Sequence, residues 1–482
     1  MSFQSSLFNV APGILPPLDP GFRPLALGVR AFRAALAAAP GRESMQVALE
    51  QTPERIHRLH LEVFPAGAGR EADNFRYLDW MVNFLLWSRG GWKVVLAGPG
   101  PLCQALARAY AAGGARAFDA ELMGQAFGRT FQVETVAPAQ VPAARSQPLA
   151  LGGHLDGCRL GFDLGASDFK VAAVRDGAVV FSAELPWNPR VEPDPDYHFQ
   201  RLNEGLRLAA AHLPRVDAIG GSSAGILVAN QVRVASLFRA VPAARWPGEV
   251  APFFARLQAQ WQVPVEVIND GEVTALAGAM ALGTTGILGL AMGSSEAAGY
   301  VDPDGAFPGW LNELAFAPVD ANPGAGTDDW SQAPGIGAAY FSQQAVARLA
   351  ALAGLGFPPA LDLPARLEAV QQRLAAGDPA ARAIFESIGV YLGYTLAWYA
   401  EFYALDHVLI LGRVTSGPGG PLLRDRALAV LASQFPDLAA GIDLALPDER
   451  SRRVGQAVAA ASLPALAGRP PRVDPTSALR SV

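Results

Sequence analysis

The sequence of 482 residues is poor in cysteine, histidine and lysine. It contains two cysteines, Cys103 and Cys158, six histidines, and only Lys93 and Lys170 as lysines among 38 basic residues. Two cysteines exclude a disulfide framework and a cysteine-rich metal cage. The chain also lacks a basic block for nucleic acid and an apolar run long enough to cross a bilayer. Its first residues lack the charged and apolar segments of a secretory signal, so we expect a cytoplasmic protein.

The composition is that of a folded protein with a large core. Hydrophobic residues make up 51% of the chain, charged residues 17%, and the net charge is −6. A chain of this length and apolarity is not disordered, and the length predicts about three domains or two large ones. In such an arginine-rich chain a retained lysine can mark a place that needs a compact ammonium, although chance explains Lys93 equally well.

Strand and helix patterns alternate along most of the chain. Residues 1–45 are rich in proline and alanine, and prolines predict a linker over 136–153. After the linker, strands predicted over 159–163, 169–175 and 178–185 precede strands and helices that alternate to about residue 464. This order predicts an α/β protein with mixed sheets. We expect an N-terminal α/β extension over 1–150, a unit over 151–282 and another over 283–482.

A turn rich in small residues follows the first strand after the linker. The segment from Phe162 to Lys170 reads Phe-Asp-Leu-Gly-Ala-Ser-Asp-Phe-Lys. Its backbone N–H groups and the Ser167 hydroxyl are suited to a phosphate, Asp163 to a hydrated Mg²⁺, and Lys170 to phosphate charge. Taken alone, such a segment is more often only a hairpin turn.

Two similar turns and one Asn-Asp pair come at the ends of later strands. The turns are Gly293-Ser294-Ser295 and the segment from Gly412 to Gly417, and the pair is Asn269-Asp270. Together the three turns could surround a nucleotide. From the residues alone, Asp270 is equally well explained as a helix cap or as a general base.

The order of these segments resembles the ROK family of repressors, open reading frames and sugar kinases, within the actin/hexokinase-like superfamily. Residues 163–170 are similar to the family's first phosphate loop, Asp-x-Gly-Gly-Thr-x-x-Lys, with Ala166 and Ser167 in place of Gly-Thr. Asn269-Asp270 matches the family's Asn-Asp pair, and the segment from Trp310 to Asp320 resembles its Gly-Glu-Leu-Gly-His segment. The resemblance covers about residues 158–465. It implies a two-lobed, actin/ribonuclease H-like kinase fold.

The resemblance also implies an activity and its site residues. The activity is ATP- and Mg²⁺-dependent phosphorylation of a hydroxyl group of a hexose or N-acetylhexosamine, with Asp270 as the general base. The remaining site residues fall into three groups. Those implied for sugar binding are Asn269, Glu313, Ser223 and Asn312. Those implied for nucleotide binding are Gly165, Ser167, Lys170, Gly293, Ser294, Ser295, Gly412 and Arg413. Asp163 is the residue implied to hold Mg²⁺ through water. The partners implied are a small-molecule sugar and a second copy of the chain in a homodimer, with no nucleic acid and no membrane.

The sequence departs from the family pattern at three places. Phe316 occupies the position of the family's histidine, and the zinc motif that commonly follows is replaced by residues 322–337, which contain no cysteine. Arg413 takes the place of the second glycine of the adenosine-side pair, where it would stack on the base, meet a phosphate or block the pocket. We therefore expect no zinc site. The departures keep open a second hypothesis, a non-catalytic sugar-sensing or regulatory protein.

A third hypothesis, a DNA-binding repressor, finds little support in the N-terminal extension. That region has no compact run of short helices with a basic recognition face. Its tryptophans and phenylalanines, including Trp80, Phe84, Trp87 and Trp92, are expected in a core.

Overall fold

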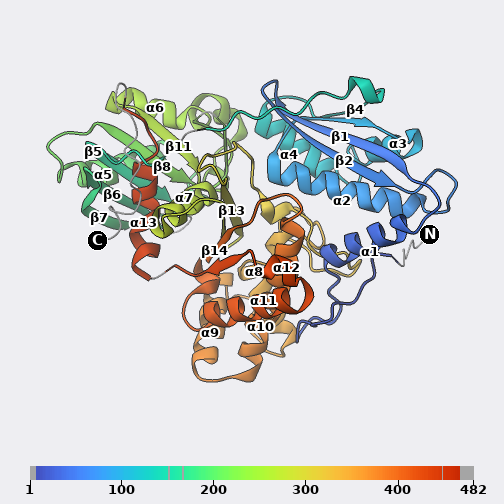
Figure 1. Ribbon diagram of the computed structural model, residues 1–482. Coiled ribbons are helices and arrows are strands. Elements are labelled where there is room, and N and C mark those ends of the chain that lie inside the picture. The colour runs from blue at the N-terminus through green and yellow to red at the C-terminus, as the bar shows by residue number, and fades with distance from the viewer. Residues whose placement is uncertain (1–6, 150–151, 166–167, 229, 448, 467–482) are drawn as a thin grey trace.

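The computed structural model describes residues 7–149, 152–165, 168–228, 230–447 and 449–466. Three mixed or antiparallel sheets with their helices make up most of it: an N-terminal sheet, a central sheet and a C-terminal sheet (Figure 1). The chain is a mixed α/β protein, as the sequence predicts. None of the described helices is both long and apolar enough to span a membrane.

The N-terminal sheet has the strand order β2-β1-β3-β4. Its strands are β1 (Glu43–Thr52), β2 (Arg55–Val63), β3 (Lys93–Ala97) and β4 (Gln132–Thr135), and its helices are α1 (Leu25–Ala37), α2 (Glu71–Arg89), α3 (Gly100–Ala109) and α4 (Ala117–Phe127). Helix α2 ends where Gly90 takes a φ of 74°, which favours glycine. Residues 1–45 were described only as rich in proline and alanine, so helix α1 was not predicted.

The central sheet has the order β11-β8-β5-β6-β7. Its strands are β5 (Cys158–Leu164), β6 (Asp168–Arg175), β7 (Ala178–Pro186), β8 (Ala218–Ser223) and β11 (Val265–Asn269). Strands β5, β8 and β11 are parallel and in register, with Leu164 opposite Ser223 and Ser223 opposite Asn269. Their carboxyl ends therefore lie at one edge of the sheet.

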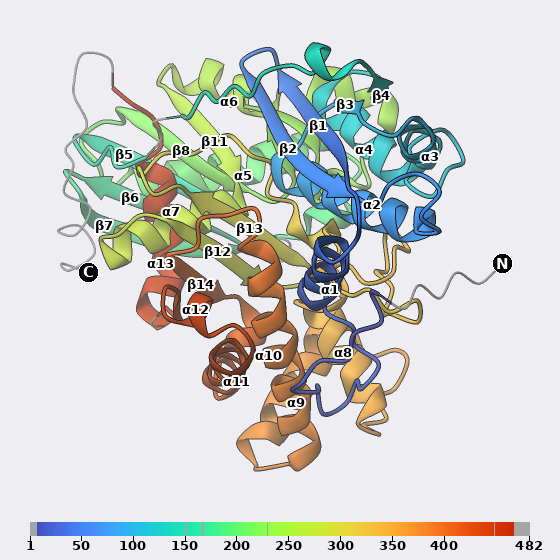
Figure 2. The ribbon, with the colours of Figure 1, turned by 45° about the vertical axis from the view of Figure 1, so that its right-hand side comes forward.

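Helices cover both faces of the central sheet, and a short hairpin extends from its edge. The helices are α5 (Pro195–Ala210), α6 (Phe253–Trp261), α7 (Asp270–Leu282) and α13 (Glu449–Ala461), and the hairpin strands are β9 (Ile226–Val228) and β10 (Gln231–Val234). Helix α13 is the last element of the chain, yet it packs on β5 and β8 of this sheet (Figure 2). It can approach because Gly161 and Gly220 have no side chain to hold it away from the strands.

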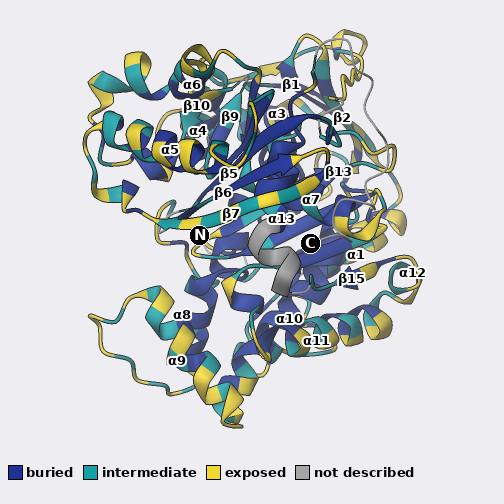
Figure 3. Cartoon of the chain, turned by 90° about the vertical axis from the view of Figure 1, so that its left-hand side faces the viewer, coloured by how far each residue is buried: buried dark blue, intermediate teal, exposed yellow. Residues whose placement is uncertain are grey.

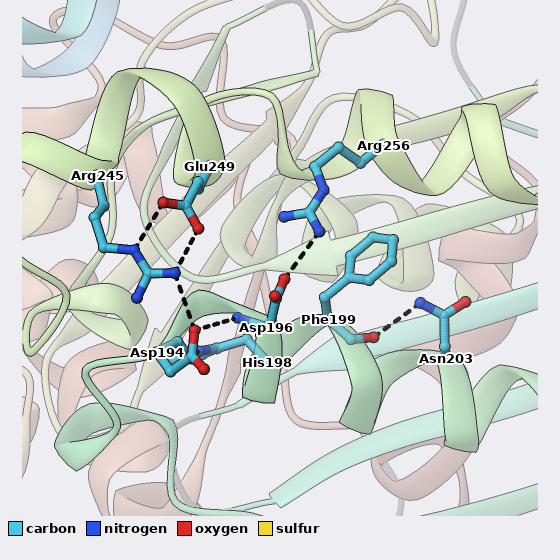
Figure 4. Close-up of polar contacts among 8 residues, drawn as sticks. All are labelled: Asp194, Asp196, His198, Phe199, Asn203, Arg245, Glu249 and Arg256. Atoms are coloured by element: carbon cyan, nitrogen blue, oxygen red, sulfur yellow. Dashed lines mark hydrogen bonds and ion pairs between the residues drawn. The ribbon is translucent and has the colours of Figure 1, made fainter.

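Polar contacts hold helix α5 against the segment from Arg245 to Arg256 of the same chain (Figure 4). The Asp194 side chain caps α5 and accepts a hydrogen bond from Arg245, which also donates two to Glu249. Arg256 of α6 donates to Asp196. None of these residues belongs to the predicted site, and the contacts serve to hold α5 and α6 together.

The C-terminal sheet has the order β13-β12-β14-β15. Its strands are β12 (Ile287–Met292), β13 (Glu296–Val301), β14 (His407–Leu411) and β15 (Asp443–Ala445), and its helices are α8 (Gln343–Leu352), α9 (Leu363–Ala375), α10 (Pro379–Tyr399), α11 (Gly419–Gln434) and α12 (Pro436–Ala439). Strands β12 and β14 are parallel, so their carboxyl ends also meet at one edge.

The N-terminal region and the C-terminal sheet share one hydrophobic core, whereas the central sheet has a core of its own. In the shared core Phe22 contacts Tyr391 with ring centroids 4.7 Å apart, and Phe84 contacts Trp398 at 5.1 Å. Burial of a phenylalanine side chain contributes about 1.5–3 kcal/mol. Figure 3 shows the buried residues concentrated in the strands and in the inner faces of the helices. The division of the chain at residues 150 and 282 stays a prediction.

Candidate functional site

The first turn lies at the carboxyl end of β5. Asp163 is buried, faces Lys170 across the β5–β6 pair, and its Oδ2 lies 3.5 Å from the Lys170 Nζ. Its Oδ1 accepts a hydrogen bond of 2.8 Å from Ser222 of the neighbouring strand. The Gly165 carbonyl accepts one from the Trp187 indole at 2.8 Å. Ser167, predicted to bind nucleotide, lies outside the described residues.

The Asn269-Asp270 pair joins strand β11 to helix α7 at the same edge. Asn269 is the N-cap of α7: its Oδ1 accepts from the Gly271 N–H at 2.7 Å, while its Nδ2 donates to the Gly225 carbonyl at 2.8 Å. Asp270 is the first residue of the helix and is half-buried. The N-cap of α7 is thus Asn269, and Asp270 Oδ1 also accepts from the Gly271 N–H, at 3.1 Å.

The second and third turns lie against each other at the edge of the C-terminal sheet. Gly412 has a φ of 98°, and a Cβ there would come within 2.5 Å of the Met292 carbonyl, just before Gly293. Ser294 and Ser295 are exposed. Only a residue without a side chain permits this approach of the two turns.

Arg413 connects the third turn to the first. Its guanidinium Nη2 lies 3.6 Å from Asp168 Oδ2, and its side chain is 60% exposed. It also lines a cavity of about 430 Å³ together with residues of the α9 region, among them Glu368 and Gln371. The three turns that the sequence singled out are therefore neighbours in space, with a cavity beside the third.

The segment that carries Asn312 and Glu313 follows the C-terminal sheet strand β13. Asn312 is buried with a φ of 52°, and its Oδ1 accepts from the Tyr403 hydroxyl at 2.9 Å. Glu313 is half-buried. Ser223, the remaining residue predicted for sugar binding, is buried at the end of β8, and its hydroxyl donates to the Ala224 carbonyl at 3.4 Å.

Burial and mutual repulsion raise the pKa values of the carboxyl groups in this region. Burial, with the nearby Asp163 charge, raises the pKa of Asp270 to about 6. Burial raises the pKa of Glu313 to about 8, and the charges of Asp270 and Glu272 add to the shift. The charge of Asp163 acts on Asp270 and the charge of Asp270 acts on Glu313, so these three acidic residues form one set that spans the two sheets.

Two further acidic residues belong to this set and were missed in the sequence. Burial raises the pKa of Glu272 to about 7 and that of Glu296 to about 8. The charge of Glu313 adds to the rise in the pKa of Glu296. Glu296 Oε1 accepts from the Tyr399 hydroxyl at 3.4 Å, while its buried Oε2 has no hydrogen-bond partner. Glu272 lies two residues after Asp270, and Glu296 follows Ser295 directly. Their closeness to these predicted motifs could have indicated them as site residues.

The side chain of Phe316 packs among other aromatic side chains. Its ring centroid lies 4.6 Å from that of Trp87 of α2 and 5.4 Å from that of Trp330. Trp330 lies within residues 322–337, the segment that the sequence comparison predicted to replace a zinc motif. In the described part of the chain, no group of three or more His, Cys, Asp or Glu side chains is arranged to hold a metal ion.

The fold is similar to those of ROK family proteins over about 63% of the chain, at low sequence identity. A ROK family transcriptional regulator, a homolog of the E. coli MLC protein, matches with a TM-score of 0.52 and 18% identity over 64% of this chain and 79% of its own. This match establishes a shared fold.

Two ROK family sugar kinases match with lower TM-scores. A hexokinase from Thermus thermophilus gives 0.48 with 20% identity, over 63% of this chain and 97% of its own. A glucokinase from Streptomyces griseus, solved in complex with glucose and AMPPNP, gives 0.45 with 18% identity, over 63% and 98%. No protein-family model and no curated protein sequence matches the chain.

Proposed function

We propose that the protein is a sugar kinase of the two-lobed, actin-like kind, which transfers the γ-phosphoryl group of ATP to a hydroxyl group of a hexose or N-acetylhexosamine. The observation that carries the proposal is the position of Asp270. Its carboxyl group begins helix α7 within the electrostatic reach of Asp163, at the sheet edge where Asp163 pairs with Lys170. Phosphoryl transfer requires such a base close to cationic groups that neutralise phosphate.

Each half of the proposed reaction has its own residues. Asp270, with a pKa of about 6, is ionised at neutral pH and accepts the proton of the attacking hydroxyl. Asn269, Asn312, Glu313 and Ser223 are proposed to hold the sugar in line for the attack.

The three neighbouring turns are suited to the phosphates, and the cavity beside Arg413 is of a size for a nucleoside. Asp163 is proposed to hold Mg²⁺ through water, because its buried carboxylate lies at the carboxyl end of β5, next to the first turn. Mg²⁺ bound with ATP neutralises phosphate charge. Lys170 adds a compact positive charge at the same turn.

Replacement of Asp270 by asparagine tests the proposal. Asp270→Asn keeps the shape of the side chain and removes the base, so turnover is expected to fall by roughly 10²- to 10⁴-fold with sugar affinity retained. The measurement is ADP release with MgATP over a panel of hexoses and N-acetylhexosamines. Turnover in the variant equal to that of the wild type would contradict the assignment.

The second candidate is a sugar-sensing protein that does not use ATP. The contact between Arg413 and Asp168 favours it, because this contact spans the region proposed for the phosphates. Calorimetric titration with each ligand separately distinguishes the two: a sensor binds sugar but not MgATP, whereas the kinase binds both.

A further inference from the structure

The end of helix α2, in the N-terminal region, supplies hydrogen-bond acceptors to the segment that carries Glu313. The Trp87 carbonyl accepts from the Glu313 N–H at 3.0 Å, the Ser88 carbonyl from Asn312 at 3.0 Å, and the Arg89 carbonyl from Leu311 at 3.1 Å. The last carbonyls of a helix have no partner inside it. Here three of them are satisfied by three consecutive amides of a distant segment.

The Arg89 side chain holds the same segment from another side. It is buried, its guanidinium carbon lies 3.2 Å from the centre of the Trp310 ring and 4.8 Å from that of Tyr403, and it donates to the Phe402 carbonyl. Tyr403 in turn donates to Asn312. The guanidinium thus fixes both the residue before Leu311 and the tyrosine that orients Asn312.

Gln51 of strand β1 links these contacts. Its buried amide Nε2 donates to the Gly309 carbonyl at 2.8 Å and to the Arg89 carbonyl at 3.1 Å. One side chain of the N-terminal sheet therefore holds the end of α2 and the start of the Trp310–Glu313 segment together.

The conformation of this segment needs such external support. Asn312 has a positive φ of 52°, a left-handed conformation that asparagine adopts more readily than most residues but less readily than glycine. A strained residue of this kind persists when its surroundings determine it. The surroundings of Asn312 are the backbone of α2 and the Tyr403 hydroxyl.

The N-terminal region also packs beside the second element proposed to bind sugar. Helix α4 packs against β9 and β10, the hairpin that follows Ser223. The region thus contacts the hairpin that follows Ser223 as well as the segment that carries Asn312 and Glu313.

We propose that the N-terminal region is the positioning element of the acceptor site: the end of α2, with Gln51 and Arg89, sets the backbone that aims Asn312 and Glu313. This inference rests on the proposed function for the roles of Asn312 and Glu313. Gln51 and Arg89 are positioning residues, since they act on these two through the backbone and through Tyr403.

Gln51→Leu tests the inference, with Gln46→Leu as its matched control. Both substitutions exchange glutamine for leucine on strand β1, but Gln46 contacts Arg58 within the N-terminal sheet. Arg89→Lys is the second variant; it retains the charge and loses the planar contact with Trp310. Two properties are measured in each full-length protein: hydrogen exchange of the amides of residues 311–313, and steady-state kinetics with varied sugar and varied MgATP.

Gln51→Leu and Arg89→Lys are expected to speed exchange at 311–313 by about 10-fold or more, because the support of these hydrogen bonds is weakened. They are expected to lower kcat/KM for the sugar by about 10- to 100-fold, mainly through KM, and to leave KM for MgATP unchanged. Gln46→Leu is expected to change neither property.

Exchange at 311–313 equal to that of Gln46→Leu would overturn the positioning role, and so would faster exchange with an unchanged KM for the sugar. If the wild-type chain phosphorylates no sugar, the proposed function fails. The exchange measurement then decides by itself whether α2 holds the segment, so the two failures are distinguishable.

Discussion

Glu296 has an environment unlike that of an ordinary surface carboxyl group. It is 4% exposed, its Oε2 lies close to Gly337 and has no hydrogen-bond partner, and burial raises its pKa from 4.5 to about 8. The folded state therefore binds its proton more tightly than the unfolded state does. The resulting stability is fully present below about pH 4.5 and is lost as the pH rises through about 8.

We predict that Glu296→Gln removes this pH dependence. Since glutamine stays neutral, the variant is expected to resist urea better than the wild type at about pH 9, with little difference at about pH 5. The measurement is the free energy of unfolding at both pH values. Glu204→Gln, on the exposed face of α5, is the control. An equal difference between wild type and Glu296→Gln at the two pH values would contradict the buried, raised-pKa state of Glu296.

Arg413 carries a prediction about the nucleotide. Because its guanidinium lines the cavity beside the third turn and reaches Asp168 of the first, it is suited to a phosphate oxygen. Arg413→Ala is expected to raise the Kd of MgATP by about 10-fold, measured by calorimetry. Arg424→Ala, an exposed arginine that pairs with its neighbour Asp425, is expected to leave the Kd unchanged. Tighter binding of MgATP by Arg413→Ala would mean that the side chain blocks the cavity.

At the residue scale, local motifs were predictable and distant contacts were not. The positions of Asp163, Lys170 and Asp270 follow from short strand-end patterns, because strand, turn and residue type lie together in the sequence. Arg89 could not be assigned in this way, since its partners Trp310 and Tyr403 are more than 200 residues away. The roles of the predicted site residues themselves stay proposals.

At the scale of elements, most strands and helices after the linker follow the predicted order. Two details differ. The strand expected over 226–236 is a hairpin, β9 and β10, and the helix expected from about residue 338 begins at Gln343, after a short 3₁₀ turn at Gly337–Ala339. Such differences arise because hydrophobic patterns locate elements better than they locate turns and helix starts.

At this scale we predict how the close packing of α13 on the central sheet affects stability. A Cβ at Gly220 would lie 1.6 Å from the Ala460 carbonyl oxygen, so α13 must move if a side chain is added. Gly220→Ala is expected to lower the free energy of unfolding by about 3 kcal/mol. Gly356→Ala, in an exposed loop with open space around it, is the control and is expected to change it by less than about 0.5 kcal/mol. Chemical denaturation measures both, and equal stability of the two variants would contradict the close packing of α13.

At the scale of the whole molecule, the N-terminal region is joined to the C-terminal sheet through one core. The sequence predicted an α/β extension and a core role for Trp80, Phe84, Trp87 and Trp92; the first three are buried, whereas Trp92 is only half-buried. It did not predict that Phe84 packs against helix α10 and Trp87 against the Glu313 segment, because no local pattern encodes which distant surface an apolar face covers. The similarity to a ROK family regulator likewise concerns the fold, and the chemistry rests on the site.

The most direct test of the central claim follows the γ-phosphoryl group itself. Wild-type protein is incubated with γ-labelled ATP, Mg²⁺ and each sugar of the panel, and the labelled products are separated. We predict a labelled sugar phosphate with at least one sugar, and its loss in Asp270→Asn. Label found only in unreacted ATP or in inorganic phosphate, with a sugar still bound by the folded protein, would contradict the kinase and favour the sensor.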